Sequence, residues 1–368
     1  MTVTDESSVG AFLVPAATAL PSNRAYLAHL AASTSNPDLI RLASNENTEP
    51  PSPRVREALE RAFTDANLSP PPTSPLQVAL AERHGVDTAQ VLVTAGSTEV
   101  IDAVFRTFLR AGSEVVLPDP SWPVFRRRLE ALEAHIVDIP LSRSEDGFRY
   151  DAPLMLAEIT SETRLVVICT PNNPTGNAME LADIRRIADT GVPLLLDAAY
   201  ADFDPARDPM HLAHEYDNLI ITRTFSKAYC LAGVRVGYAV GNAALLDYVD
   251  RFLVPGSSVS GPSLHAGLAA FEDEGYHQLQ VERITRERER LLPVLRGLGL
   301  RAYASGGNFL PVDCSEPPAA SAFAASVLAH NVVIRPLHSL VRISIGRREE
   351  NDALVAAIAR VIEAEGAP

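Results

Sequence analysis

The sequence has few cysteines and little positive charge, and each shortage excludes a class of protein. Three cysteines occur among 368 residues, Cys169, Cys230 and Cys314, and no two of them form a CxxC pair. A disulfide framework is therefore excluded, and reduced thiols in a reducing compartment are expected. Acidic residues outnumber basic ones by 46 to 32, which gives a formal net charge of −14. Because nucleic acids and anionic membranes bind clustered positive surfaces, we expect neither as a partner.

The sequence also lacks a long apolar run and a set of metal-binding side chains. No apolar stretch reaches the length of a membrane-spanning helix, and the acidic, polar first residues do not have the pattern of a signal peptide. His211 and His214 lie close together without further ligands nearby, so no metal site is expected. These features predict a cytoplasmic protein with a small-molecule partner. That partner can be anionic, since one or two arginines suffice to bind a small anion.

Between about residues 90 and 245, short apolar runs alternate with amphipathic stretches. The runs are rich in Val, Ile and Leu and too short for helices, as is typical of strands buried on both faces. Strands that alternate with helices predict an α/β domain with a mostly parallel sheet covered on both faces. The predicted helices include 98–110, 123–134 and 181–188, and the predicted strands are 91–94, 114–117, 165–170, 192–197, 219–224 and 234–240.

The chain is longer than one compact core usually requires, so a second domain is expected. A helix near 319–330, strands at 332–335 and 341–345 and a closing helix at 349–365 predict a smaller α+β unit. We assign residues 45–248 to the large domain, and residues 1–44 and 249–368 to the small one. The proline-rich segment 70–75 is expected to be loop or extended chain. The charge-rich segment 281–290 is expected to be a solvated helix face.

Polar residues after the predicted strands are the candidates for chemistry, because ligands of such sheets bind beyond the carboxyl ends of the strands. Ser97 and Thr98 open a helix whose free N–H groups can bind an anion such as phosphate. Asp197 ends an apolar strand, where a carboxylate needs a cation or a donor. Taken singly, such residues are ordinary caps, core or turn residues. Taken in order they predict one site, which also includes Trp122, Asn173, Tyr200, Thr224, Ser226, Lys227 and Arg235.

This order of residues resembles the signature of the aspartate-aminotransferase fold, the large fold class of pyridoxal-phosphate (PLP) enzymes. The resemblance covers about residues 40 to 350 and rests on Asn-Pro-Thr-Gly at 173–176, Asp197 with Tyr200, Ser226-Lys227 and Arg235. It implies a three-layer αβα large domain with a mostly parallel seven-stranded sheet, and PLP as the cofactor. It also implies a homodimer that builds each site at the subunit interface.

The resemblance further implies a role for each residue. Lys227 would hold PLP as an imine and then act as a general base. Asp197 would keep the pyridine nitrogen protonated, so that the ring can accept electrons. Tyr200 and Asn173 would bind the ring oxygen, and Trp122 would stack on the ring. The phosphate would be bound by Ser97, Thr98, Thr224, Ser226 and Arg235.

Within this class, segments 42–47, 226–238 and 341–351 resemble those of histidinol-phosphate aminotransferases. The resemblance implies an aminotransferase that acts on an amino acid or related amine, with Arg342, Arg335 and Asn47 binding the substrate. Arg342 would meet an anionic group, whereas Arg335 could equally be a surface residue. Because the same cofactor chemistry serves several reactions, a PLP lyase, decarboxylase or cyclase is the alternative.

The sequence departs from this family around the substrate. Leu68 stands where the family usually has a tyrosine that reaches the cofactor phosphate of the partner subunit, and Gln77 stands where an arginine is usual. Cys230 replaces a glycine or alanine, and the segment between Arg335 and Arg342 is shorter than usual. These changes surround the entrance for the substrate and leave the predicted cofactor contacts intact.

Overall fold

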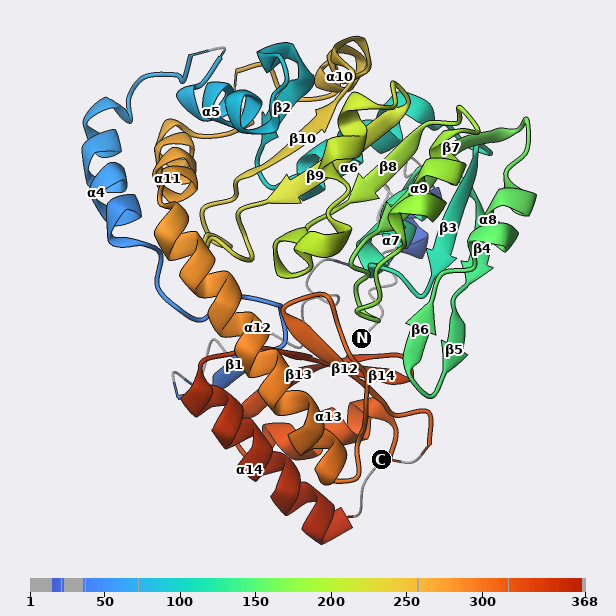
Figure 1. The fold of residues 1–368 in the computed structure, drawn as a ribbon, viewed down its shortest axis with the longest axis vertical. Coiled ribbons are helices and arrows are strands. Elements are labelled where there is room, and N and C mark those ends of the chain that lie inside the picture. Colours follow the sequence, from blue (N-terminus) through green and yellow to red (C-terminus); the bar gives the residue numbers. More distant parts are fainter. Residues whose placement is uncertain are drawn as a thin grey trace, which may run out of the picture.

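A seven-stranded sheet forms the centre of the larger part of the molecule (Figure 1). The computed structural model describes residues 15–20, 22, 36, 38–71, 73–256, 258–316 and 318–365. The strand order is β2-β10-β9-β8-β7-β3-β4, where β10 is antiparallel to β2 and β9 and the other neighbours are parallel. The predicted α/β class with a mostly parallel sheet is thereby confirmed. The strands are β2 (Val91–Thr94), β3 (Glu114–Asp119), β4 (His135–Pro140), β7 (Thr163–Cys169), β8 (Leu194–Asp197), β9 (Leu219–Thr224) and β10 (Gly237–Gly241).

Helices cover both faces of this sheet, which explains why its central strands are apolar without alternation. Along β7, Leu165 and Val167 pack with one helix layer, and Val166 and Ile168 pack with the other. One layer comprises α6 (Ser97–Phe108), α7 (Pro123–Ala131) and α10 (Ala243–Asp250). The other comprises α4 (Pro53–Ala62), α5 (Pro75–His84), α8 (Ala152–Glu158), α9 (Leu181–Ala188) and α11 (Gly261–Glu272).

The larger part of the structure differs from the prediction at two elements. Strand β4 was not predicted, because His135–Pro140 mixes polar and apolar residues at a sheet edge, where burial is partial. The proline-rich segment is not loop throughout, since Pro75 opens α5 with Ser74 as its N-cap. Proline suits the first turn of a helix because its missing N–H would have no helical partner there.

A second, five-stranded sheet forms the smaller part, in the order β1-β13-β14-β12-β11. Its strands are β1 (Ile40–Leu42), β11 (Arg301–Ala302), β12 (Phe309–Asp313), β13 (Val332–Leu337) and β14 (Leu340–Ser344). Helices α13 (Ala320–Leu328) and α14 (Arg348–Glu365) pack on it, which agrees with the predicted α+β pattern. The chain also forms a short hairpin, β5 (Ser142–Ser144) with β6 (Gly147–Arg149), and the single-turn helix α1 (Pro15–Ala19).

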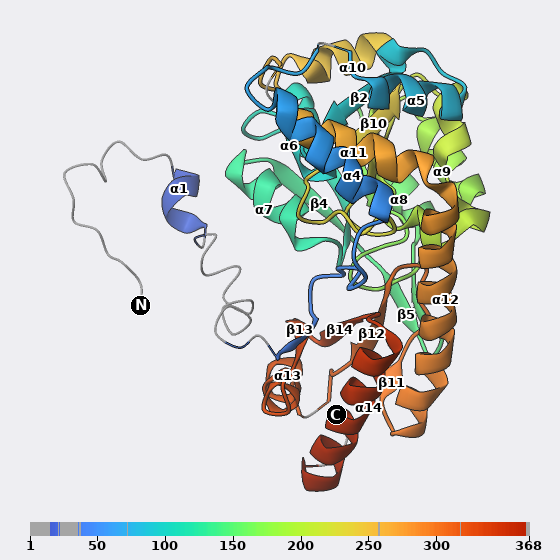
Figure 2. The same cartoon turned by 90° about the vertical axis from the view of Figure 1, so that its left-hand side faces the viewer.

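The long helix α12 (Glu274–Gly297) runs from the large part to the small one (Figures 1 and 2). Its charge-rich stretch is not simply a solvated face, which corrects the prediction. Glu287 is 6% exposed and contacts Asn351 and Arg348 of α14, because this side of the helix faces α14. Helix α11, just before α12, packs on α4 and α5. The predicted domain boundary at residue 248 stays a prediction.

None of the helices in the described part of the chain is long and apolar enough to cross a membrane.

Candidate active site

A cavity of about 350 Å³ lies where the strands of the large sheet end and face the small sheet. All but one of the predicted site residues line it. They are Ser97, Thr98, Trp122, Asn173, Asp197, Tyr200, Thr224, Ser226, Lys227, Arg235, Arg335 and Arg342; the exception is Asn47. The structure therefore brings together side chains that are spread over about 250 residues of sequence.

One end of the cavity is built to hold an anion. Ser97 and Thr98 begin α6, so the free N–H groups of this helix terminus point out of its first turn. The Arg235 guanidinium lies 3.4 Å from the Ser226 hydroxyl and 3.4 Å from the Ala95 carbonyl. Gly96 has a φ of 81°, and a Cβ at this position would lie 2.3 Å from Nη2 of Arg235. The backbone thus makes room for the guanidinium beside the helix terminus, an arrangement that suits a phosphate.

A buried carboxylate lies at the end of β8. Asp197 is 3% exposed, and Oγ1 of Thr222 donates a hydrogen bond of 3.1 Å to it. Burial raises the pKa of Asp197 to about 6, while Thr222 and the Ala199 N–H act against this rise. The Cys169 thiol lies 4.0 Å from the same carboxylate, and burial keeps the pKa of this thiol well above its ordinary value. A buried carboxylate of this kind is suited to bind a protonated ring nitrogen.

Tyr200 stands at the centre of a hydrogen-bond network that joins the two sheets. Its hydroxyl accepts from Nδ2 of Asn45 at 3.0 Å and from Nδ2 of Asn173 at 3.3 Å. Oδ1 of Asn173 accepts in turn from Arg342 at 2.6 Å, and Arg342 also donates to the Ala43 carbonyl at 2.7 Å. Burial raises the pKa of Tyr200, so the phenol stays protonated and can also donate. This network places Arg342, which is 7% exposed, at the cavity wall.

Lys227 points into the cavity and carries an unusually acidic ammonium group. Its Nζ donates to the Ser44 carbonyl at 3.2 Å and lies 5.9 Å from the centre of the Tyr200 ring. Burial, followed by the charge of Arg342, lowers the pKa of Lys227 from 10.5 to about 8. The fraction of Lys227 that is unprotonated at pH 7 therefore rises from about one in three thousand to about one in ten. Only the free amine can attack a carbonyl or accept a proton.

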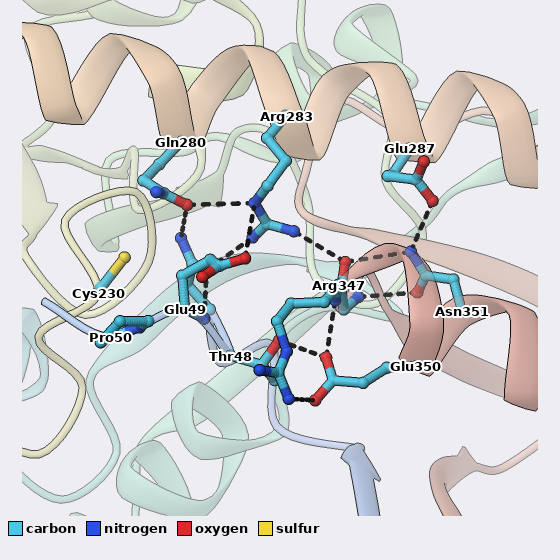
Figure 3. Close-up of polar contacts among 12 residues, drawn as sticks. Thr48, Glu49, Pro50, Cys230, Gln280, Arg283, Glu287, Arg347, Glu350 and Asn351 are labelled. Atoms are coloured by element: carbon cyan, nitrogen blue, oxygen red, sulfur yellow. Dashed lines mark hydrogen bonds and ion pairs between the residues drawn. The ribbon is translucent and has the colours of Figure 1, made fainter.

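Asn47 is the one predicted site residue that the structure places elsewhere. Its amide donates to Gln280 at 3.3 Å and accepts from Arg283 at 2.8 Å, both on α12. Figure 3 shows Arg283 reaching from α12 toward Glu49 and toward the chain that enters α14. Asn47 therefore helps to fix the segment that connects β1 to α4, and it does not line the cavity.

Two residues of the site were missed by sequence reasoning. Asn45 is fully buried, has a φ of 52° and donates to the Tyr200 hydroxyl, so it positions Tyr200 without lining the cavity itself. One indication of this role was present in the sequence, since asparagine tolerates a positive φ better than most residues. Thr222 was also missed, although it lies two residues before Thr224 and therefore on the same face of β9.

The departures from the family pattern lie at the edge of the site or outside it. Leu68 is 63% exposed and does not line the cavity. Gln77 donates to the backbone carbonyls of Thr88 and Val91 and so joins α5 to the segment that enters β2. Cys230 has a φ of 60°, in the left-handed region that favours glycine, which explains why a glycine is usual there.

Comparison with known proteins agrees with this geometry. The family model described as aminotransferase class I and II matches residues 37–358. Histidinol-phosphate aminotransferase 2 of Caulobacter vibrioides is 38% identical over 341 residues, which cover 90% of this chain and 89% of the relative. An aromatic amino acid aminotransferase of Rhodococcus opacus is 34% identical over 328 residues, which cover 88% and 90%. The crystal structure of histidinol-phosphate aminotransferase from Sinorhizobium meliloti with pyridoxal-5'-phosphate has a TM-score of 0.84, is 26% identical, and matches 96% of this chain and 98% of its own.

The fold and the relatives define the class as the fold type I enzymes that use PLP. Within it, the chain belongs to the class I and II aminotransferases. The predicted cofactor and the predicted transaminase activity are confirmed by this membership. The alternative of a PLP lyase, decarboxylase or cyclase is not favoured by these matches.

Proposed function

We propose that this enzyme moves the amino group of an amino acid or related amine through PLP held at Lys227. Bound PLP would supply a carbonyl that an amine can attack and a ring that takes up electrons. The observation that carries the proposal is the placement of an amine with a pKa of about 8 and a buried carboxylate in one cavity that ends in an anion site. Lys227 would also accept and return the proton at the substrate α-carbon.

The cofactor contacts follow from the geometry of the cavity. The terminus of α6 with Ser97 and Thr98 would bind the phosphate, together with Arg235. Asp197 would bind the ring nitrogen, because a proton shared there relieves the cost of the buried charge. Tyr200 and Asn173 would bind the ring oxygen, Trp122 would pack on the ring, and Thr224 and Ser226 would add hydroxyl contacts to the phosphate.

Residues of the small sheet would bind the substrate. Arg342 and Arg335 are paired directly across β13 and β14 and both line the cavity. We propose that Arg342 binds the substrate carboxylate and that Arg335 assists, since a guanidinium can bind a carboxylate by two hydrogen bonds. The similar proteins include one named for histidinol phosphate and one named for aromatic amino acids. The amines tested with the enzyme should therefore include histidinol phosphate and the aromatic amino acids.

We also propose that the enzyme acts as a homodimer in the cytoplasm. Several large apolar side chains are exposed on the large part, Phe63, Leu68, Tyr248, Phe252 and Val254. A monomer gains nothing from exposing them, and a second copy could bury them. Sedimentation of Phe252→Glu beside the wild type tests the dimer, which this charge should weaken. An unchanged sedimentation coefficient would place the interface elsewhere.

The cysteines support the proposed cytoplasmic location. All three are unpaired, as is usual in a reducing compartment.

The test of the transaminase proposal is one half-reaction. The PLP-loaded enzyme is mixed with single amino acids and no keto acid, and the cofactor is then identified by mass spectrometry. Conversion to pyridoxamine phosphate with release of a keto acid supports the proposal, and Lys227→Ala should abolish it. A product formed while the cofactor remains pyridoxal phosphate would instead point to a lyase or decarboxylase.

A further inference from the structure

A second cavity adjoins the active site. It has a volume of about 520 Å³ and shares three wall residues with the first, Trp122, Pro123 and Leu337. The two cavities therefore meet at the indole of Trp122 and at the hairpin of β13 and β14. None of the contacts proposed for the cofactor requires this second space.

The hairpin of β13 and β14 extends from one cavity to the other. It turns through only two residues, and two of its three directly opposed pairs are Arg335 with Arg342 and Leu337 with Leu340. Opposed residues point to the same face of a sheet, and so do residues two apart along a strand. One face of the hairpin thus presents two arginines and, about 7 Å further along, two leucines. The arginines belong to the first cavity, and the leucines lead into the second.

Several walls of the second cavity are made of apolar side chains. Besides Trp122, Pro123 and the two leucines they include Leu117, Pro120, Pro174 and Phe148, while Ser121, His338 and Ser339 add polar groups. Planar and ring-shaped side chains on several sides suit a flat guest, which packs by offset or edge contacts on aromatic walls.

The two arginines of the second cavity already have acidic partners. Arg126 lies 3.4 Å from Asp119 and forms a closer ion pair with Asp138, and all three line the cavity. Arg143 forms an ion pair with Asp313 and lies over the Phe148 ring at 5.8 Å. A phosphate entering this space would compete with these carboxylates and be repelled by them. An uncharged group is not repelled by these carboxylates.

We infer that the second cavity receives the side chain of the substrate and selects a flat, uncharged one, such as an aromatic ring, over a phosphate ester. The inference rests on the proposed function, because it requires the substrate carboxylate at Arg342. A carboxylate followed by an apolar ring in the substrate has the same order as the arginines followed by the leucines along the hairpin face. The turn between the two strands consists of His338 and Ser339 alone, and Leu337 beside it lines both cavities.

The test uses the PLP-loaded enzyme and ligands that carry no amine, so that binding is read without turnover. The dissociation constants of propionate, 3-phenylpropionate and 3-phosphonopropionate are measured from the change in cofactor absorbance. For the wild type we expect 3-phenylpropionate to bind about tenfold or more tighter than propionate, and 3-phosphonopropionate to show no such gain. Leu337→Trp, which adds bulk where the two cavities meet, should remove most of the affinity that the phenyl group adds over propionate.

Phe148→Ala serves as a second variant if the tryptophan disturbs the hairpin, and it should reduce the phenyl gain without affecting propionate. Leu328→Ala, an exposed position on α13, is the matched control and should change neither constant. A phenyl gain that survives both cavity variants, or a phosphonate that binds tighter than the phenyl ligand, overturns the inference. Failure of every amino acid to yield pyridoxamine phosphate would instead refute the proposed function, whatever the carboxylates show.

Discussion

Replacing Asp197 by asparagine should stabilise the cofactor-free protein above pH 7, although it should weaken cofactor binding. Asp197 is 3% exposed, and burial raises its pKa from 3.8 to about 6. A group whose pKa is raised on folding stabilises the folded state while it is protonated, and this contribution is lost as the pH rises through the folded pKa. At pH 8 the ionised carboxylate therefore lowers the free energy of unfolding.

The size of the effect follows from the two pKa values. A difference of about two units, at 1.36 kcal/mol each, corresponds to ~3 kcal/mol. An amide escapes this cost but has only one oxygen to accept from Thr222 and the Ala199 N–H, and the lost hydrogen bond costs about 1 kcal/mol. We therefore expect the Asp197→Asn protein to be ~2 kcal/mol more stable at pH 8. The difference should fall to about zero near pH 4, where the aspartic acid of the wild type is also neutral.

Urea unfolding of the cofactor-free proteins between pH 4 and pH 8 measures this difference. Asp65→Asn, at an exposed position, is the control for removing one negative charge from the protein. A PLP titration of the same variants should show weaker binding for Asp197→Asn alone. The reasoning is refuted if Asp197→Asn is no more stable than the wild type at pH 8, or if its advantage is the same at every pH.

Three further substitutions test the site. Thr222→Val removes the hydroxyl that donates to the carboxylate at the end of β8, so it should raise the pKa of that group and move the acidic limb of kcat/KM to higher pH, with Thr222→Ser close to wild type. Arg342→Ala should weaken propionate by about tenfold or more and PLP far less; equal loss of PLP binding would assign the arginine a different role. Gly96→Ala should weaken PLP binding, since its Cβ would displace Arg235, whereas Gly112→Ala, also at a positive φ but with no atom within 4 Å, controls for backbone strain alone and should leave PLP binding unchanged.

The fold and the cofactor end of the site could be predicted because both depend on local signals. The apolar runs of β7, β8 and β9 are buried on both faces, so their composition alone indicates a covered parallel sheet. The carboxyl ends of such strands meet at one edge. Asp197 and Lys227 could therefore be assigned to one cavity without knowledge of any distance.

The connections between the two sheets could not be predicted in this way. Whether Asn45 or Asn47 contacts Tyr200 depends on the positive φ of Asn45 and on Arg283, which binds Asn47 from a helix more than 230 residues away in sequence. The charges of α12 concealed its buried side in the sequence, since Glu287 meets Asn351 and Arg348 of α14 only in the folded chain. Side chains of mixed character that join distant elements carry no periodic signal.

The pKa values of Lys227 and Asp197 approach each other, at about 8 and about 6, because burial penalises the charge of each. The charge of a neighbouring group can therefore decide whether Lys227 and Asp197 are protonated near neutral pH. After burial, the charge of Arg342 is the largest influence that lowers the pKa of Lys227. A carboxylate bound at Arg342 offsets that charge, so it should raise the pKa of Lys227 and make the amine a stronger base when substrate is present. Titration of Lys227 in the cofactor-free protein, with and without propionate, measures this coupling; a pKa that falls or stays constant would show that the carboxylate binds elsewhere.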